Sequence, residues 1–339
     1  MPDSSARPVI LVNLPRDLGD GLFCAPALKK IADFAAAQGM EIVTVGAKHR
    51  HGWAETVSGT TLPFHDTAAA PLPPQTLSRA ALGFNFDFYE HSFCDTYPAV
   101  PVYQPEKMEV VEKDTAQFGA GAVVGKKHIF DLLNDCLRDA GVLKAGEKLP
   151  LPAMPDALTR DEAVREAQKK FGLEDGEKYA IFVPVCAANR PFKRWQIEKF
   201  AEVASHYEAQ GITPVIIGGP AEAEKQTCAD LAARISSKAK NICGQTSLGD
   251  IAALARGAQF TLGNDTGPTH IAAAGGTPVY TLYGYYNDPA TWQSLTPGHT
   301  AKPLVGAKIQ DIAALDAIAV IDTARSAAPR IAPAAQTPR

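Results

Sequence analysis

The sequence predicts an α/β protein with two doubly wound parallel sheets that face each other across a cleft, and three observations support this fold class. The 339 residues exceed what one hydrophobic core usually holds, so we expect two domains. Short apolar runs alternate with longer helical segments, as strands and crossover helices do in parallel sheets. Between the two series lie residues 148–155, KLPLPAMP, whose three prolines exclude a regular helix and indicate a linker.

The first series begins with an apolar run that suits a buried parallel strand, followed by a helix that ends at Gly39. Residues 59–74 are rich in Thr, Ala and Pro, which predicts irregular structure. The expected strands cover residues 9–14, 41–45 and 84–89, and the expected helices cover residues 21–38 and 129–140.

The second series repeats this pattern after the linker. The expected helices cover residues 160–171, 196–210, 221–236, 248–255 and 266–274, and the expected strands cover residues 179–185, 214–218, 241–243, 258–262 and 278–282. Ligands of doubly wound sheets bind beyond the carboxyl ends of the strands, so two facing domains would bind a ligand between them. An amphipathic stretch at residues 309–324 and a tail from residue 326 complete the chain.

Composition excludes several classes of protein. A net charge of −4 and a pI of about 6.1 argue against a nucleic-acid-binding protein, which would carry a basic face. No apolar run reaches the length needed to span a bilayer, and residues 1–8 lack the basic start and apolar core of a signal peptide. The six cysteines are scattered without CxxC pairs, which predicts reduced thiols in a cytoplasmic protein and no zinc site.

The most informative segment is residues 262–284, LGNDTGPTHIAAAGGTPVYTLYG. It predicts a turn and a small-residue helix between two strands. The free amides at the start of this helix, beside the positive end of its dipole, would favour a phosphate, although an ordinary capped helix fits the same residues. These amides belong to Thr266, Gly267, Thr269 and His270.

The segment resembles the signature of glycosyltransferase family 9, the bacterial heptosyltransferases of lipopolysaccharide synthesis. Asp265, Thr266, Gly267 and His270 match its D-T/S-G-x-x-H-L/I-A-A-A pattern in register. Three further segments match the family in order, namely LGDGLFCAPAL at 18–28, one residue shorter here, NRPFKRW at 189–195 and NICGQTSL at 241–248. The match is specific for the family and much less specific for the sugar.

The resemblance implies the GT-B fold, with residues 1–150 binding the acceptor, residues 151–308 binding the nucleotide-sugar donor and residues 309–325 forming a helix that crosses back to the first domain. Residues 326–339 are expected to be a disordered tail. It further implies an inverting transferase without a cofactor. The donor would be ADP-heptose or a related nucleotide sugar. The acceptor would be a lipopolysaccharide core or another cell-surface glycan, either lipid-linked or not, and the protein would be cytoplasmic, with peripheral contact to the inner face of the cytoplasmic membrane left open. The oligomeric state stays open.

Inverting sugar transfer needs a base for the acceptor hydroxyl and positive charge on the leaving diphosphate. The resemblance places the base at Asp20, in the first turn of the first helix. A helix-capping aspartate would use the same residue type at the same place, and Asp17 is a nearby competitor as base. Lys193 matches the family's diphosphate-neutralising lysine, with a solvated lysine as the alternative. Arg190 could add the bidentate phosphate contacts that a guanidinium favours.

The remaining candidates flank the donor. Asp265 would be repelled by a diphosphate, so we expect it to cap the helix at 266–274 and fix its amides. His270 either touches phosphate or packs on a neighbouring strand. Glu222 is a candidate for the ribose hydroxyls, against the alternative of a solvated glutamate. Thr246, Ser247 and Leu248 would border the base.

Other patterns point away from competing functions. GAGAVVGKK at residues 119–127 lacks the glycine spacing and the Ser/Thr of a P-loop and fits a mobile loop over the acceptor better. No DxD pair is placed to hold a metal on a diphosphate, so we expect a metal-independent enzyme. Two alternatives stay open, a non-catalytic nucleotide-sugar-binding member of the family and a nucleotide-dependent epimerase of GT-B architecture.

Overall fold

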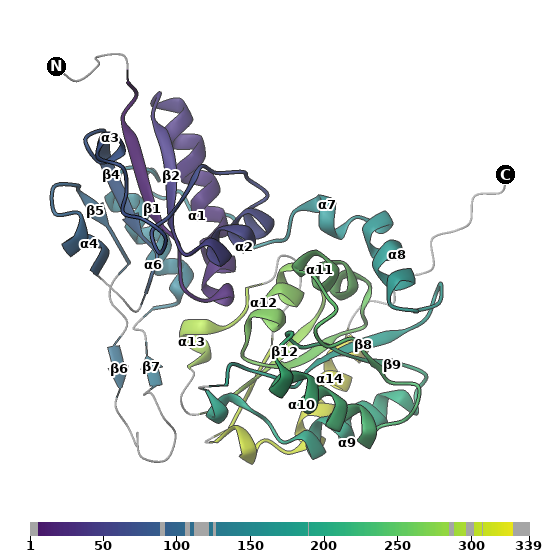
Figure 1. The fold of residues 1–339 in the computed structure, drawn as a ribbon. Coiled ribbons are helices and arrows are strands. Elements are labelled where there is room, and N and C mark those ends of the chain that lie inside the picture. The colour runs from purple at the N-terminus through teal and green to yellow at the C-terminus, as the bar shows by residue number, and fades with distance from the viewer. Residues whose placement is uncertain are drawn as a thin grey trace.

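The protein is described here by a computed structural model, which covers residues 6–88, 92–105, 109–111, 122–124, 127–188, 190–284, 288–295, 302–306 and 308–327 (Figure 1). Of the loop predicted at residues 119–127, residues 119–121, 125 and 126 lie outside the described residues, whereas residues 122–124 form a short strand. The tail from residue 328 also lies outside the described residues. Within the described part of the chain, no helix combines the length and the apolar character needed to cross a membrane.

The first domain is built on a parallel five-stranded sheet in the order β3-β2-β1-β4-β5. Its central strand is fully apolar apart from its last residue, because helices cover both faces. The strands are β1 (Val9–Asn13), β2 (Glu41–Gly46), β3 (Phe64–Asp66), β4 (Ala80–Asn85) and β5 (Val102–Tyr103). The helices are α1 (Leu18–Ala37), α2 (Lys48–Ser58), α3 (Pro74–Leu77), α4 (Ser92–Thr96) and α6 (Ile129–Asp139), and β6 (Glu109–Val111) pairs antiparallel with β7 (Ala122–Val124).

The second domain is built on a parallel six-stranded sheet in the order β10-β9-β8-β11-β12-β13. The strands are β8 (Tyr179–Val183), β9 (Thr213–Ile216), β10 (Lys240–Asn241), β11 (Thr261–Asn264), β12 (Val279–Tyr283) and β13 (Lys302–Val305). The helices are α7 (Asp156–Thr159), α8 (Asp161–Lys170), α9 (Ile197–Glu208), α10 (Glu222–Arg234), α11 (Leu248–Gly257), α12 (Gly267–Ala274), α13 (Pro289–Trp292) and α14 (Ala314–Ala327), with short 3-10 turns η1 (Pro191–Lys193) and η2 (Ile309–Asp311).

The two domains meet where the amino-terminal ends of α1 and α12 pack against each other. Gly267 lies against Leu18, so closely that a Cβ on Gly267 would be 3.0 Å from Leu18 Cδ2. The ring of His128, the N-cap residue of α6, donates a hydrogen bond across the interface, with Nε2 2.9 Å from the backbone oxygen of Gln293. These contacts bring the first turn of α1 to the edge of the second sheet.

One helix was not predicted, and two predictions about local structure were wrong. Helix α2 was not foreseen, because KHRHGWAETVS lacks a clear apolar period, although Trp53, Ala54 and Val57 are buried. The strand expected at 84–89 is β4, which ends at Asn85. The segment expected to be irregular at 59–74 contains β3, which pairs with β2.

The C-terminal helix does not cross back to the first domain as predicted. Helix α14 packs on α9 of the second domain, where Ala317 and Ile321 are fully buried. The Tyr207 hydroxyl of α9 donates to Asp322 Oδ1 at 2.9 Å. Apolar and polar complementarity to α9 therefore sets the position of this helix. It extends to Ala327, so Ser326 and Ala327 are helical rather than part of a disordered tail.

Candidate active site

Asp20 occupies the first turn of α1 and faces the domain interface. Its side chain is 5% exposed, and Oδ2 has no hydrogen-bond partner among the described residues. The N-cap residue of α1 is Asp17, three residues earlier, so Asp20 is not the helix cap. A buried carboxylate oxygen without a partner is costly, which indicates a role other than stability.

The surroundings of Asp20 favour its protonated form. Burial raises the pKa of Asp20 well above its usual range, and the Asp17 and Asp87 carboxylates add to this rise. The positive charges of Arg190 and Lys193 oppose it without cancelling it. Because a base needs a pKa near the working pH, this environment suits proton abstraction better than an exposed aspartate would.

Two cations reach this region from the loop that follows β8. Arg190 Nη2 lies 3.1 Å from Asp17 Oδ2, an ion pair that links the two domains. Lys193 Nζ lies 2.6 Å from Asp265 Oδ2, and its side chain is 12% exposed. Lys193 is therefore held at the interface and is not a solvated surface lysine.

Asp265 is the centre of a buried polar chain and does not cap α12 as predicted. The N-cap of α12 is Thr266, whose side chain makes no capping bond. Burial would raise the pKa of Asp265, but the Lys193 ammonium and the bond from His270 outweigh it and hold that pKa well below its usual range. His270 Nε2 donates to Asp265 Oδ1 at 3.0 Å, and its Nδ1 lies 2.7 Å from Ser294 Oγ.

The amino-terminal end of α12 has fewer open amides than predicted. The amides of Thr269 and His270 donate to the Thr266 carbonyl at 3.0 and 3.2 Å. The Thr269 hydroxyl donates to the Asn264 carbonyl at 2.7 Å and is buried. Among the described residues, the amides of Thr266 and Gly267 donate no hydrogen bond within this helix terminus.

The predicted nucleoside-binding residues do not contact this cluster in the described structure. The Glu222 side chain is 90% exposed and lies 3.7 Å from Lys225. Ser247 caps α11, accepting from the Asp250 amide at 3.1 Å, while Thr246 and Leu248 flank it. Glu222 is thus a solvated residue at the start of α10, and Ser247 is a helix cap.

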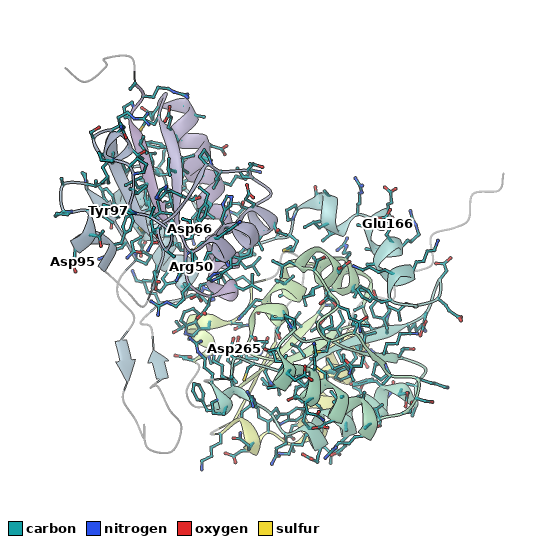
Figure 2. The ribbon with its side chains drawn as sticks, in the orientation of Figure 1. Arg50, Asp66, Asp95, Tyr97, Glu166 and Asp265 are labelled. Carbon is teal, nitrogen blue, oxygen red and sulfur yellow. The ribbon has the colours of Figure 1, made fainter. Side chains whose placement is uncertain are left out.

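Sequence reasoning missed two contributors, Ser294 and Asp87. Ser294 is buried against His270 and belongs to no motif, so no sequence pattern indicated that it would be part of the site. Asp87 is 4% exposed and pairs with Arg16 and Arg50 at 3.3 and 3.8 Å. The polar residues that alternate with phenylalanine in FNFDF, at 84–88, were a visible signal for it. In Figure 2, Arg50 and Asp265 both lie on the sides of their domains that are turned toward each other.

The sequence model of glycosyltransferase family 9 (heptosyltransferase) matches residues 138–308, half of the chain. This chain belongs to glycosyltransferase family 9. The four segments that suggested the family therefore identified it correctly, and three of them supply Asp20, Lys193 and Asp265.

Curated relatives match part of the chain. The lipopolysaccharide core heptosyltransferase OpsX of Haemophilus influenzae is 37% identical over 127 residues, which are 37% of this chain and 36% of the relative. Lipopolysaccharide heptosyltransferase 2 of Salmonella typhimurium is 30% identical over 149 residues, 43% of this chain and 42% of the relative. The matched region thus spans less than half of the length of either relative.

Solved structures match nearly the whole chain. A family 9 glycosyltransferase from Veillonella parvula superposes with a TM-score of 0.68 at 18% identity, over 95% of this chain and 98% of the other. E. coli ADP-heptose heptosyltransferase II superposes with a TM-score of 0.68 at 17% identity, over 94% and 98%. The predicted GT-B fold, with two parallel-sheet α/β domains, is confirmed.

Proposed function

We propose that this protein transfers heptose from ADP-heptose to a sugar of a lipopolysaccharide core, with inversion and without a metal ion. The observation that carries the proposal is the buried Asp20, whose Oδ2 has no hydrogen-bond partner among the described residues and which feels the charges of Lys193 and Arg190. The relatives named above as lipopolysaccharide heptosyltransferases support the choice of sugar and acceptor.

In this mechanism ionised Asp20 takes the proton of the acceptor hydroxyl while that oxygen attacks the anomeric carbon of the donor. The bond from the anomeric carbon to the diphosphate breaks on the opposite face, so a single displacement inverts the configuration. Burial strengthens the basicity of the carboxylate because it disfavours the charged form.

Positive charge is available where the diphosphate would depart. Lys193 and Arg190 supply two cationic side chains, and the amides of Thr266 and Gly267 add donors at the positive end of α12. Asp265 would repel a diphosphate, and its bond to Lys193 instead fixes the ammonium in place. This set of charges is our reason for proposing a metal-independent reaction that needs no cofactor.

The residues proposed to bind the nucleoside of the donor have less support from the structure than those proposed to act on the diphosphate. Glu222 would have to move from solvent to reach a ribose. Thr246 and Leu248, which flank the Ser247 cap of α11, would offer backbone groups to the base. A lipid-linked acceptor would bring the protein to the inner face of the membrane. Asp20, Lys193 and Arg190 would catalyse transfer from another nucleotide sugar by the same chemistry. The identity of the donor therefore needs a direct test.

Calorimetric titration of the purified protein with ADP-heptose, UDP-glucose and GDP-mannose tests the donor. We expect ADP-heptose to bind and the other two to bind at least tenfold more weakly, a difference of about 1.4 kcal/mol. Incubation with ADP-heptose and the oligosaccharide of deacylated rough lipopolysaccharide should then yield a heptosylated product, with or without excess EDTA. Preference for UDP- or GDP-sugars would overturn the choice of donor. Binding without transfer would indicate a non-catalytic member of the family.

A further inference from the structure

Asn264, the last residue of β11, is completely buried and holds the loop between β8 and α9 at both of its ends. Its Nδ2 donates to the Pro184 carbonyl at 2.8 Å, and its Oδ1 accepts from the Trp195 amide at 3.1 Å. Pro184 directly follows β8, and Trp195 lies just before α9. A single side chain therefore bonds to the two ends of a loop that spans residues 184–196, all described except residue 189.

The chemistry of the amide group suits this double contact. An asparagine side chain carries two N–H donors and one carbonyl acceptor. Its orientation follows from its partners, because the Trp195 amide can only donate and the Pro184 carbonyl can only accept. The backbone ladder between β8 and β11 extends to Val183, opposite Gly263. The side chain of the next residue, Asn264, thus continues the connection between the two strands where the ladder ends.

The loop that Asn264 holds carries two of the candidate site residues, Arg190 and Lys193, and we call residues 184–196 the cationic loop. The Lys193 amide donates to the Arg190 carbonyl at 3.0 Å, so the two cations share one turn. The Lys193 ammonium donates to Asp265, the residue that follows Asn264, at 2.6 Å. Two consecutive residues at the end of β11 therefore fix the cationic loop at both ends and at Lys193.

Asn264 also joins the cationic loop to the amino-terminal end of α12. Its backbone carbonyl accepts from the Thr269 hydroxyl of α12 at 2.7 Å. On the other side of the loop, the Trp195 indole Nε1 donates to the Ile312 carbonyl at 3.0 Å. Asn264 is thus the residue through which the position of the cationic loop is set relative to α12.

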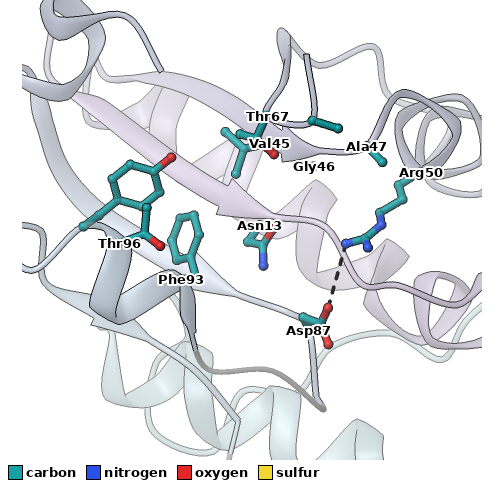
Figure 3. Close-up of a pocket in the computed structure, with 11 residues that line it drawn as sticks. Asn13, Val45, Gly46, Ala47, Arg50, Thr67, Asp87, Phe93 and Thr96 are labelled. Carbon is teal, nitrogen blue, oxygen red and sulfur yellow. Dashed lines mark ion pairs between the residues drawn. The ribbon is translucent and has the colours of Figure 1, made fainter. Parts of the chain in front are cut away.

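A central strand of the first domain also ends in an asparagine, but its surroundings differ. Asn13 lines an open pocket of about 290 Å³ beside the ion pair of Arg50 and Asp87 (Figure 3). Its Nδ2 donates to Asn85 Oδ1 at 2.8 Å, within the same sheet edge. Asn13 therefore borders open space, whereas Asn264 is enclosed and bonded to both ends of a loop.

We propose that Asn264 is a positioning residue of the transfer reaction, which holds the cationic loop where Lys193 and Arg190 meet the departing diphosphate. It acts through these two cations and does not itself touch the substrate. Charges stabilise a transition state best when they are already in place, because no free energy is then spent on moving them during the reaction. The inference rests on the proposed function and adds the residue that sets the position of its cations.

Replacing Asn264 by alanine removes both side-chain bonds to the cationic loop. With ADP-heptose and the oligosaccharide of deacylated rough lipopolysaccharide, Asn264→Ala should lower kcat about tenfold or more, as displaced catalytic groups do. The KM for the oligosaccharide should stay within about twofold. Thr261→Val is the matched control and should match the wild type. Thr261 lies on the same strand and is equally buried, and its hydroxyl has no hydrogen-bond partner among the described residues.

A loss that acts through Lys193 must shrink when Lys193 is absent. In a Lys193→Ala background, Asn264→Ala should lower kcat by only about threefold or less, the remaining effect acting through Arg190. An unchanged kcat in Asn264→Ala would overturn the inference, as would a full further loss of about tenfold in the Lys193→Ala background.

Limited proteolysis separates this inference from the proposed function, because it needs no activity. Trypsin can cleave after Lys193 and Arg194, whereas Arg190 is followed by a proline and resists it. Cleavage after Lys193 and Arg194 should be about fivefold faster or more in Asn264→Ala than in the wild type, since the loop has lost both of its end contacts. Cleavage after Lys170, which is exposed at the end of α8, should be unchanged.

Faster cleavage confined to the cationic loop supports the inference even if no sugar is transferred, in which case only the transferase proposal fails. Equal cleavage of the loop in Asn264→Ala and wild type, or an equal acceleration at Lys170, overturns the inference whatever the activity. Asn264→Ser, which can replace one of the two bonds, undergoes the same assays should Asn264→Ala not fold. Failure of both variants to fold, judged by circular dichroism beside Thr261→Val, would assign Asn264 to folding alone and overturn the inference.

Discussion

Asp20 occupies a position at which its side chain destabilises the folded protein. It is buried, one of its oxygens has no partner in the described structure, and its pKa is raised by burial and by neighbouring carboxylates. A group with these properties destabilises the folded protein at neutral pH, because ionising it there costs more than in the unfolded chain. The presence of this destabilising aspartate is explained if the reaction needs a base at this position.

Replacing Asp20 by asparagine should therefore raise the melting temperature at neutral pH. The folded state keeps its Asp20 proton over a range of pH in which the unfolded chain, with a pKa of about 3.9, has lost it. Wild-type stability falls as the pH rises through that range, whereas asparagine does not titrate. The excess of the melting temperature of Asp20→Asn over that of the wild type should thus grow from about pH 4 to pH 8, as measured by thermal melts at each pH.

Asp33→Asn is the matched control for these melts, because Asp33 lies on the same helix but is exposed. It should leave the melting temperature close to that of the wild type. A lower melting temperature for Asp20→Asn at every pH would contradict the assignment of Asp20 as a strained, partnerless carboxylate.

Asp265 should behave in the opposite way. Asp265→Asn leaves Lys193 without its carboxylate partner, and breaking a buried ion pair in this way costs about 3–5 kcal/mol at neutral pH. The folded-state pKa of Asp265 is lowered, so its contribution is present above the unfolded pKa and is lost as the pH falls toward the folded one. Urea unfolding at neutral and acid pH should show that the difference in free energy of unfolding between the wild type and Asp265→Asn becomes smaller in acid. A difference that grows in acid would contradict this explanation.

At the scale of elements, the strand–helix–strand unit around residues 262–284 was predictable. Apolar runs and the glycine pair at 275–276 placed β11, α12 and β12, although β11 begins three residues later than expected. Helix α2 was missed because its buried residues Trp53, Ala54 and Val57 stand among histidine, arginine and glycine. Its stability comes from packing against α1, which a local pattern does not contain.

Gly267 lies in the contact between α1 and α12, a role that the family motif alone did not indicate. The missing side chain of Gly267 leaves room for Leu18, because a Cβ at this position would meet three atoms of Leu18 at 3.0–3.2 Å. Gly267→Val should therefore destabilise the α1–α12 contact by roughly 1–3 kcal/mol, as overpacking usually does. Leu18→Ala in the same chain should recover part of that loss, measured by urea unfolding of the two single variants and the double variant.

If the two changes are additive instead, the steric account of Gly267 is wrong. Calorimetry with ADP on the same variants distinguishes the two roles of this glycine. A double variant that regains stability but still binds ADP weakly would show that Gly267 also borders the diphosphate.

At the scale of the whole molecule, the sequence predicted two parallel-sheet domains because the alternation of strands and helices is a local property repeated along the chain. It did not predict how the domains meet. The ion pair between Arg190 and Asp17 and the bond from His128 to Gln293 join residues more than 160 positions apart. The position of α14 on α9 likewise depends on Tyr207, which no pattern linked to that helix.

The candidate site was predictable only in part for the same reason. The family motifs supplied Asp20, Lys193, Arg190, Asp265 and His270. Their partners came from the fold, since the bonds of Lys193 to Asp265 and of His270 to Ser294 depend on how the loop after β8 and the segment after α13 meet α12.

The central claim is that Asp20 is the base of a sugar transfer at the domain interface. Its most direct test is the turnover number of Asp20→Asn with ADP-heptose and deacylated rough lipopolysaccharide, compared with that of Asp17→Asn. We predict that Asp20→Asn lowers turnover about 10²-fold or more, the usual contribution of a positioned base. Asp17→Asn should stay within about tenfold of the wild type, because Asp17 acts on the site indirectly, through its ion pair with Arg190 and its contribution to the raised pKa of Asp20. Turnover of Asp20→Asn close to the wild-type rate, or a larger loss in Asp17→Asn, would contradict it.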